Sequence, residues 1–208
     1  MNVLIINGSY AYSQLFSRLG HKEVSDIATA ELLVFTGGAD VSPHLYGAKK
    51  HPQTGSSPAR DAAEELFFDA AIERGIPMVG ICRGGQFLNV KSGGEMYQHV
   101  DKHCGNHEIT DLESGETVLV SSTHHQMMKP SPEGILVASS GLGGGREWYE
   151  GQVFKKDVSN EDIEVVFYPH TRALCFQPHP EFTGEVYTGM HRYFENCLKR
   201  YIYETIEA

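Results

Sequence analysis

The sequence presents one reactive residue most clearly, Cys82, within Gly80-Ile81-Cys82-Arg83-Gly84. The motif follows an apolar stretch and precedes the helical-looking residues Phe87 to Val90. In the pattern G-x-C-x-G, small residues on both sides of a nucleophile let the chain turn sharply from a strand into a helix. Amide dipoles at the start of that helix favour a thiolate over a thiol. The pattern predicts a nucleophilic cysteine, and a buried cysteine beside a glycine turn is the alternative.

A thiolate nucleophile needs a base, and Gln177-Pro178-His179-Pro180-Glu181 supplies one after a β-like stretch. In an extended chain, side chains two residues apart point to the same side, so Glu181 can hold one imidazole nitrogen of His179 while the other faces Cys82. The two prolines limit the conformations of this segment. Taken alone, the pair indicates no more than a surface histidine near a glutamate. Together with the cysteine motif it predicts a Cys82–His179–Glu181 triad.

Paired glycines in Thr36-Gly37-Gly38-Ala39-Asp40 follow a second buried apolar stretch. In a parallel sheet this loop lies beside the cysteine turn, where a glycine N–H can point at a developing oxyanion. The N–H of Arg83, the residue after the nucleophile, is the other expected donor. A plain turn is the alternative for these glycines.

Clustered histidines raise the question of a metal: His99, His103 and His107 lie close to Cys104. Gly105-Asn106 interrupts the helical spacing that would align them, and the separations match no familiar tetrahedral ligand pattern. His124-His125 is similarly ambiguous, and we interpret it as part of the substrate site. We therefore expect no metal and no cofactor.

These residues require a scaffold of buried strands that end in small-residue turns. Three apolar runs meet this description, and a helical pattern lies between the second and the third, with Ser57 and Pro58 at its start and Gly75 at its end. We place the strands at residues 1–7, 32–35 and 77–81, and the helix at 59–74 with apolar residues Ala63, Leu66, Phe67 and Ala70. Strand, helix, strand in this order predicts a parallel sheet whose strand ends gather the reacting groups.

The rest of the chain adds β-like segments and a closing helix. Short β-like runs occupy the middle, from about residue 95 to 140, and two more follow. The apolar face of the last helix is core packing, formed by Val186, Met190, Tyr193, Phe194, Cys197 and Tyr201. With 208 residues and neither a linker nor a repeat, the sequence reads as a single α/β domain spanning 1–208.

Composition narrows the function classes. The formal charge of −10 disfavours binding to nucleic acid or to an anionic membrane. No apolar stretch has the length of a signal-peptide core or a membrane span. The four cysteines are widely spread and form no CxxC pair, so we expect a reducing cytoplasmic location.

With these motifs the chain resembles the class I glutamine amidotransferase superfamily, and within it the γ-glutamyl hydrolase branch that includes bacterial γ-glutamyl-γ-aminobutyrate hydrolases. The superfamily match rests on the cysteine motif with Gln86, the His179-Pro180-Glu181 ending, and Gly37-Gly38 with Asp40. The branch is indicated by four features that follow one another in the family's order: residues 37–43, the arginine after the cysteine, residues 93–99 and residues 122–126. Arg60-Asp61 with Glu64 resembles a further branch motif, with a solvated charged helix start as the alternative.

The resemblance implies a flavodoxin-like fold: a mostly parallel sheet flanked by helices, with a small additional β segment in the middle of the chain. It also implies that Cys82, His179 and Glu181 form the triad and carry a γ-glutamyl thioester. By the same resemblance Gly38 and Arg83 donate to the oxyanion. The glutamyl group would be held by Gln86 and by the backbone of Ser122, Thr123 and His124.

Three functions remain open on the sequence. The favoured one is hydrolysis of a γ-glutamyl amide, a small-molecule substrate, with release of glutamate. The second is a glutaminase subunit that passes ammonia to a separate synthetase partner, since the sequence contains no second domain to use it. The third is a catalytically silent binding module, which the chemically competent triad argues against. The leaving amine and the oligomeric state, including a homodimer, are not specified by the residues.

Overall fold

The computed structural model describes residues 1–204 and is built on a nine-stranded sheet with strand order β2-β1-β3-β4-β14-β13-β10-β7-β8. The first five of these strands are mutually parallel. They are β2 (Lys22–Glu23), β1 (Asn2–Ile6), β3 (Leu32–Phe35), β4 (Met78–Ile81) and β14 (Ala173–Phe176). This confirms the expected parallel core, with the three N-terminal apolar runs as adjacent strands.

Four antiparallel strands extend the sheet beyond β14. They are β13 (Asp162–Tyr168), β10 (Ile135–Ser140), β7 (His107–Asp111) and β8 (Thr117–Val120). Antiparallel neighbours need no crossover helix, so the sequence here consists of short β-like runs separated by polar turns.

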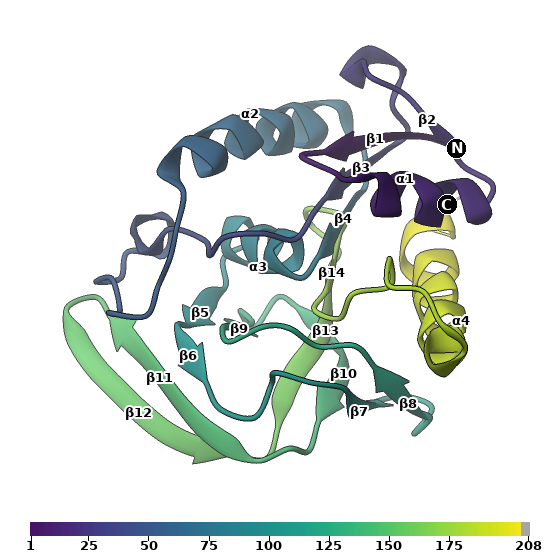
Figure 1. Ribbon diagram of the computed structural model, residues 1–208. Helices are drawn as coiled ribbons and strands as arrows, with labels where there is room; N and C mark the ends of the chain where they lie inside the picture. Colours follow the sequence, from purple (N-terminus) through teal and green to yellow (C-terminus); the bar gives the residue numbers. More distant parts are fainter. Residues whose placement is uncertain (205–208) are drawn as a thin grey trace.

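Helices cover both faces of the parallel core, as Figure 1 shows. Within β3, Leu32 and Val34 pack in the core on the side of α1 (Tyr10–Arg18) and α4 (Thr188–Leu198). Leu33 and Phe35 pack on the opposite side with α2 (Pro58–Arg74) and α3 (Arg83–Lys91). Because successive strand residues point to opposite faces, a strand buried on both sides is apolar throughout. None of these helices is long and apolar enough to cross a bilayer.

Two small sheets lie beside the main one. One pairs β5 (Glu95–Tyr97) with β9 (Met127–Lys129), and the other has the order β12-β11-β6. The strands of the latter are β6 (His99–Val100), β11 (Gly144–Glu150) and β12 (Val153–Ser159). The β11–β12 hairpin forms the green edge of the molecule in Figure 1. These sheets match the additional β segment expected in the middle of the chain. The β11–β12 hairpin, which ends at Ser159, continues beyond the expected end of that segment near residue 140.

Helix α2 begins and ends as the sequence predicts but buries another face. Ser57 is the N-cap residue, Pro58 is in the first turn, and Gly75 ends the helix with φ +66°. Of the apolar residues that indicated this helix, Leu66 is 73% exposed, whereas Phe67 packs partly buried against the core. The buried residues are Asp61, Glu64, Phe68 and Ala71. The physical reason is that α3 directs an arginine at this face, so two carboxylates are buried in place of apolar residues.

The C-terminal helix matches the predicted core face except at its start. Met190, Tyr193, Phe194 and Cys197 are buried, and Tyr201 follows in a π-helical turn, η4 (Lys199–Tyr203). Val186 is 55% exposed because it belongs to a separate 3₁₀ turn, η3 (Glu185–Tyr187), which is not in register with α4. The remaining short helices are η1 (Ile27–Thr29) and η2 (Pro43–Tyr46).

Candidate active site

Cys82 lies at the junction between β4 and α3 in a strained backbone conformation, with φ +52° and ψ −114°. Its N–H donates to the carbonyl of Phe176 at 2.8 Å, which ties the turn to β14. A non-glycine residue with positive φ costs free energy, and such strain is typical of a nucleophile exposed on a strand-to-helix turn.

The two glycines of the motif are required by close approach of backbone to backbone. A Cβ on Gly84 would lie 2.1 Å from the carbonyl oxygen of Phe35, and a Cβ on Gly80 would lie 2.3 Å from that of Gly84. Both distances are far inside van der Waals contact, and backbone atoms cannot move aside as a flexible side chain can. The glycine spacing therefore follows from packing the turn against β3.

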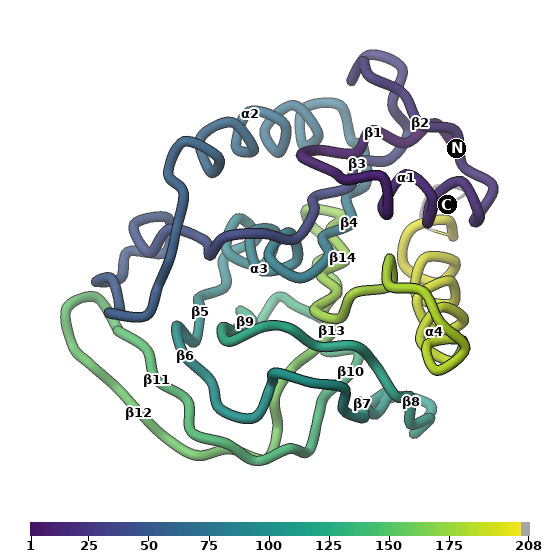
Figure 2. The backbone as a smooth tube through the Cα atoms, viewed as in Figure 1, coloured from purple at the N-terminus to yellow at the C-terminus, as the bar shows by residue number. Residues whose placement is uncertain are grey.

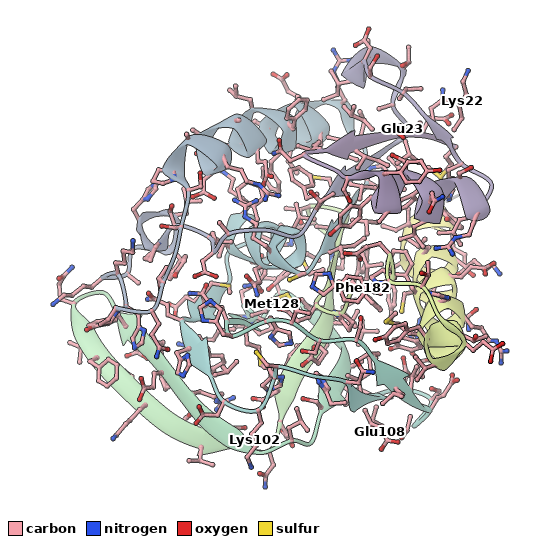
Figure 3. All side chains as sticks on the ribbon, viewed as in Figure 1. Lys22, Glu23, Lys102, Glu108, Met128 and Phe182 are labelled. Atoms are coloured by element: carbon pink, nitrogen blue, oxygen red, sulfur yellow. The ribbon has the colours of Figure 1, made fainter. Side chains whose placement is uncertain are left out.

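His179 follows β14 and is held on several sides. Its Nδ1 lies 2.7 Å from Glu181 Oε1, and its backbone N–H donates to Ser121 Oγ at 3.1 Å. The ring of Phe182 stacks on the imidazole with a centroid distance of 4.8 Å and an interplanar angle of 11°. Figure 3 labels Phe182 on the segment between β14 and α4. These contacts orient the imidazole, and the two-residue spacing of His179 and Glu181 does bring carboxylate and ring together.

One pocket of about 230 Å³ brings Cys82 and His179 together. They lie at the carboxyl ends of β4 and β14, which are paired neighbours in the sheet. The loop after β3 contributes Gly38, so three adjacent strand ends meet here. The other lining residues are Asp40, Arg83, Gln86, Thr123, His124, His125 and Gln126.

The electrostatics of the pocket favour a protonated His179. Burial by itself lowers the pKa of this imidazole, but hydrogen bonds to Cys82 and Glu181 and the charges of both groups raise it to about 10. At neutral pH the site therefore holds an imidazolium between a carboxylate and the cysteine.

The glycine loop after β3 is fixed by Arg60. Its guanidinium donates to the carbonyls of Thr36 at 2.8 Å and Gly37 at 3.0 Å, and the N–H of Gly37 donates to the hydroxyl of Tyr12 at 3.0 Å. Gly38 has φ +149°, and a Cβ there would lie 2.0 Å from Arg60 Nη1. Gly38 therefore cannot carry a side chain while Arg60 occupies this position.

The side chain of Arg83 points into the protein interior, where it pairs with Asp61 and Glu64 of α2. All three side chains are at most 2% exposed. Burial and the neighbouring Arg60 lower the pKa of Arg83 to about 10, so it stays charged at neutral pH. The solvated alternative for the Arg60-Asp61 motif is therefore wrong at Asp61 and Glu64. These two carboxylates anchor α3 through Arg83, which also lines the pocket.

Gln86 lines the pocket. Its Nε2 donates to the carbonyl of Gln126 and to Gln177 Oε1, both at 3.1 Å. It therefore joins α3 to the loop after β8 and to the end of β14.

The loop after β8 contributes its residues unequally. Thr123 Oγ1 lies 2.8 Å from His179 Nε2, and His124 Nδ1 lies 2.8 Å from the carbonyl of Gln126. Ser122 does not line the pocket, since its hydroxyl donates to the carbonyl of His103 instead. Figure 2 traces this loop past the end of β14.

Sequence reasoning did not single out Tyr12 or Phe182. Phe182 has a local signal, since it directly follows Glu181. Tyr12 has none, because only the packing of α1 against β1 and β3 brings its hydroxyl to Gly37.

Comparison with known families gives a match to the Peptidase C26 model over residues 21–142. The chain belongs to the Peptidase C26 family. The matched range of this class I glutamine amidotransferase-like family includes Cys82 and the loop after β8, while His179 lies beyond it. The glutamine amidotransferase-like protein YvdE of Lactococcus lactis subsp. lactis is 30% identical over 207 residues, with 84% of this chain and 80% of YvdE covered. The γ-glutamyl-γ-aminobutyrate hydrolase PuuD of Escherichia coli is 27% identical, with 77% of this chain and 67% of PuuD covered.

Solved structures share the fold of this C26 chain. A glutamine amidotransferase from Thermotoga maritima aligns with a TM-score of 0.62 at 14% identity, covering 96% of this chain and 84% of the other. A GMP synthase subunit from Thermoplasma acidophilum aligns with a TM-score of 0.63 at 16% identity, covering 100% of this chain and 97% of the other. At these identities the likeness concerns the fold alone.

Proposed function

We propose that this C26 chain hydrolyses γ-glutamyl amide bonds through a thioester on Cys82. The observation that carries the proposal is one pocket shared by Cys82 and His179, with the far nitrogen of His179 on Glu181 at 2.7 Å. A nucleophile, a base and a group that orients the base are the parts that covalent acyl transfer requires.

In the first step Cys82 Sγ forms a bond to the amide carbon, and the carbonyl oxygen becomes an oxyanion. The N–H groups of Gly38 and Arg83, two residues that line the pocket, would hold it. The C–N bond then breaks as the His179 imidazolium gives its proton to the departing amine. The products of this step are a free amine and a γ-glutamyl thioester.

In the second step His179, now neutral, takes a proton from water. The resulting hydroxide bonds to the thioester carbon, and the C–S bond breaks to return the Cys82 thiolate and release glutamate. The raised pKa of His179 suits the first step, because the imidazolium is present at neutral pH.

The γ-glutamyl specificity is supported by the similarity to PuuD, a γ-glutamyl-γ-aminobutyrate hydrolase. It is also supported by the polar lining of the pocket, which includes Gln86 and the imidazole of His125, itself 3.1 Å from Asp40. The chain acting alone as a hydrolase is the favoured form. A synthetase partner and a homodimer stay predictions.

Labelling with an electrophilic glutamine analogue, such as a diazoketone, tests the proposal. We expect one adduct on Cys82, located by peptide mass spectrometry, and loss of turnover by about 10³-fold or more in Cys82→Ala. Cys104 is the exposed cysteine and serves as the matched control, so Cys104→Ser should still be labelled. Label that persists in Cys82→Ala overturns the assignment.

Turnover of a panel of γ-glutamyl amides by the purified chain separates the functions. Release of glutamate by the chain alone, at a rate that no added synthetase increases, supports the hydrolase. Tight binding without turnover, or turnover only when a synthetase is added, contradicts it.

A further inference from the structure

Adjoining the pocket is a buried cluster whose side chains the proposed reaction does not use: His103, His107, His124 and Glu164. Of these, His124 also lines the pocket. Each offers one nitrogen or carboxylate oxygen, and these four atoms lie within 4.8 Å of one another. The side chains are at most 4% exposed. They come from the segment before β7, the first residue of β7, the loop after β8, and β13, so they are distant in sequence.

The outer nitrogen of each histidine faces a hydrogen-bond acceptor. His107 Nδ1 lies 3.3 Å from the carbonyl of Gly105, and His124 Nδ1 lies 2.8 Å from the carbonyl of Gln126. A carbonyl only accepts, so these rings carry a proton on Nδ1. Nε2 of each ring faces Glu164, at 3.2 Å for His107 and 3.5 Å for His124, where it donates to the carboxylate when protonated and can bind a metal when it is not. The contacts at Nδ1 set the tautomers that metal-binding histidines use.

The outer nitrogen of His103 also faces a hydrogen-bond acceptor, in this case a carboxylate. Its Nε2 lies 3.0 Å from Asp162 Oδ2, which leaves Nδ1 facing Glu164 Oε1 at 3.2 Å. A carboxylate on the outer nitrogen of a metal-bound histidine fixes the ring and makes it a stronger ligand.

The inward-facing atoms of the cluster contact one another, but not all of them form hydrogen bonds. Glu164 Oε1 lies 3.2 Å from both His103 Nδ1 and His107 Nε2, and Glu164 Oε2 lies 3.5 Å from His124 Nε2. Among residues 1–204, His103 Nδ1, His124 Nε2 and Glu164 Oε2 have no well-formed hydrogen bond. Buried polar atoms are almost always satisfied, so these atoms require either further protons on the imidazoles or a cation between them.

We propose that His103, His107, His124 and Glu164 bind one Zn²⁺ ion in a closed tetrahedral site. Three imidazoles and one carboxylate suit zinc, whereas calcium and magnesium prefer oxygen ligands. Tetrahedral zinc places its ligand atoms roughly 3.3 Å apart, so the widest spacing, up to 4.8 Å, has to shrink by about 1.5 Å on binding. The sequence predicted no metal because the spacing of His99, His103 and His107 matches no ligand pattern and because His124 was assigned to the substrate site. Glu164, in β13, gave no signal in the sequence.

The ion would act as a structural clamp under the pocket wall. His124 directly follows Thr123, which contacts His179, and Cys104 pairs with Thr123 in an isolated bridge. The carbonyl of His103 also accepts from Ser122. Zinc would therefore tie the 103–107 segment to the loop after β8, independently of which reaction the pocket performs.

Metal analysis of the full chain without a histidine tag tests the site. We expect about one equivalent of zinc by mass spectrometry of the purified protein, or on titrating chelator-treated protein with Zn²⁺. Cobalt in place of zinc should give the intense visible bands of tetrahedral coordination, a readout that needs no variant. Binding well below one equivalent, or cobalt bands typical of six-fold coordination, overturns the proposal.

Variants distinguish a metal from a proton shared within the cluster. His107→Gln keeps a donor for Glu164 but removes a good ligand, so it should lose stoichiometric zinc while folding normally by circular dichroism. Asp162→Asn should weaken zinc affinity roughly 10- to 100-fold. His170→Gln, in a half-exposed pair with Glu133, is the control and should bind as the wild type does.

Two further outcomes would overturn the zinc site. One is unchanged zinc binding in His107→Gln, and the other is a wild-type melting temperature that neither Zn²⁺ nor a chelator changes. Neither result bears on the thiol chemistry, because labelling of Cys82 is scored separately.

Discussion

Thr123 Oγ1 lies 2.8 Å from His179 Nε2, on the opposite side of the ring from Glu181. The imidazole is therefore held at both nitrogens, by a carboxylate at Nδ1 and by a hydroxyl at Nε2. When His179 is protonated, Nε2–H donates to this hydroxyl, so Thr123 orients the proton that the proposed mechanism delivers to the leaving amine.

Replacing Thr123 by valine removes the hydroxyl and keeps the shape. We expect kcat to fall by about tenfold, the value of one hydrogen bond near 1.4 kcal/mol, with KM changing less than about twofold. Thr123→Ser should restore kcat, because it restores the oxygen. Steady-state kinetics on a γ-glutamyl amide measures both, and a Thr123→Val enzyme as fast as the wild type contradicts the positioning role.

Glu181→Gln should change the pH dependence of the reaction. The raised pKa of His179, about 10, keeps the proton donor available, so kcat/KM should decline only as the pH rises through about 10. The substitution puts a neutral amide where the carboxylate was and so removes one of the charges that hold this proton. The descending limb of the pH–rate profile should therefore move to lower pH, and a limb that does not move would sink the assignment of Glu181.

The same proton makes stability depend on pH. His179 titrates near 6.5 when unperturbed and near 10 in the folded chain, so the folded state holds a proton that the unfolded state has lost between these values. The stabilisation is complete below pH 6.5 and is lost as the pH rises through about 10. Denaturant unfolding across this window should show a steeper loss of free energy for the wild type than for His179→Asn.

Two basic residues of α3 that pair with carboxylates of α2 offer a matched comparison. Arg83→Met leaves Asp61 buried without a cationic partner and leaves Glu64 paired with Arg60 alone, so it should lower the free energy of unfolding by about 3 to 5 kcal/mol. Lys91→Met breaks the partly exposed pair with Glu65 and should cost less than about 1 kcal/mol. Chemical denaturation measures the free energy of unfolding of both variants. Equal decreases would contradict the expectation that the buried pairs of Arg83 contribute more to stability than the partly exposed pair of Lys91.

The cysteine turn should resist even a methyl group. In Gly84→Ala the new Cβ meets the Phe35 carbonyl at 2.1 Å, so we expect a loss of about 3 kcal/mol, the upper end for overpacking, together with loss of Cys82 labelling. Gly141→Ala is the control, since nothing lies within 4 Å of its Cβ, and it should change stability by less than about 0.5 kcal/mol. If the two variants unfold alike, the steric account of the turn fails.

Much of the fold could be predicted from the sequence because its signals are local. The strand at Leu32–Phe35 is an uninterrupted apolar run buried on both faces, and Ser57, Pro58 and Gly75 mark the ends of α2 by their own backbone preferences. The inward face of α2 could not be predicted in this way, because hydropathy does not show that a buried arginine on another helix recruits two carboxylates.

The sequence by itself determined where the chain makes its sharp turn at Cys82, since glycines at 80 and 84 act on the backbone next to them. It also determined the pairing of His179 with Glu181, which two residues of chain bring together. Only the tertiary structure decided that Thr123 meets His179, that Arg83 turns inward, and that three histidines and Glu164 converge. Such contacts join residues 19 to 61 positions apart, the extremes being Arg83 with Glu64 and His103 with Glu164. Their distances depend on how strands are ordered in the sheet, which no local pattern encodes.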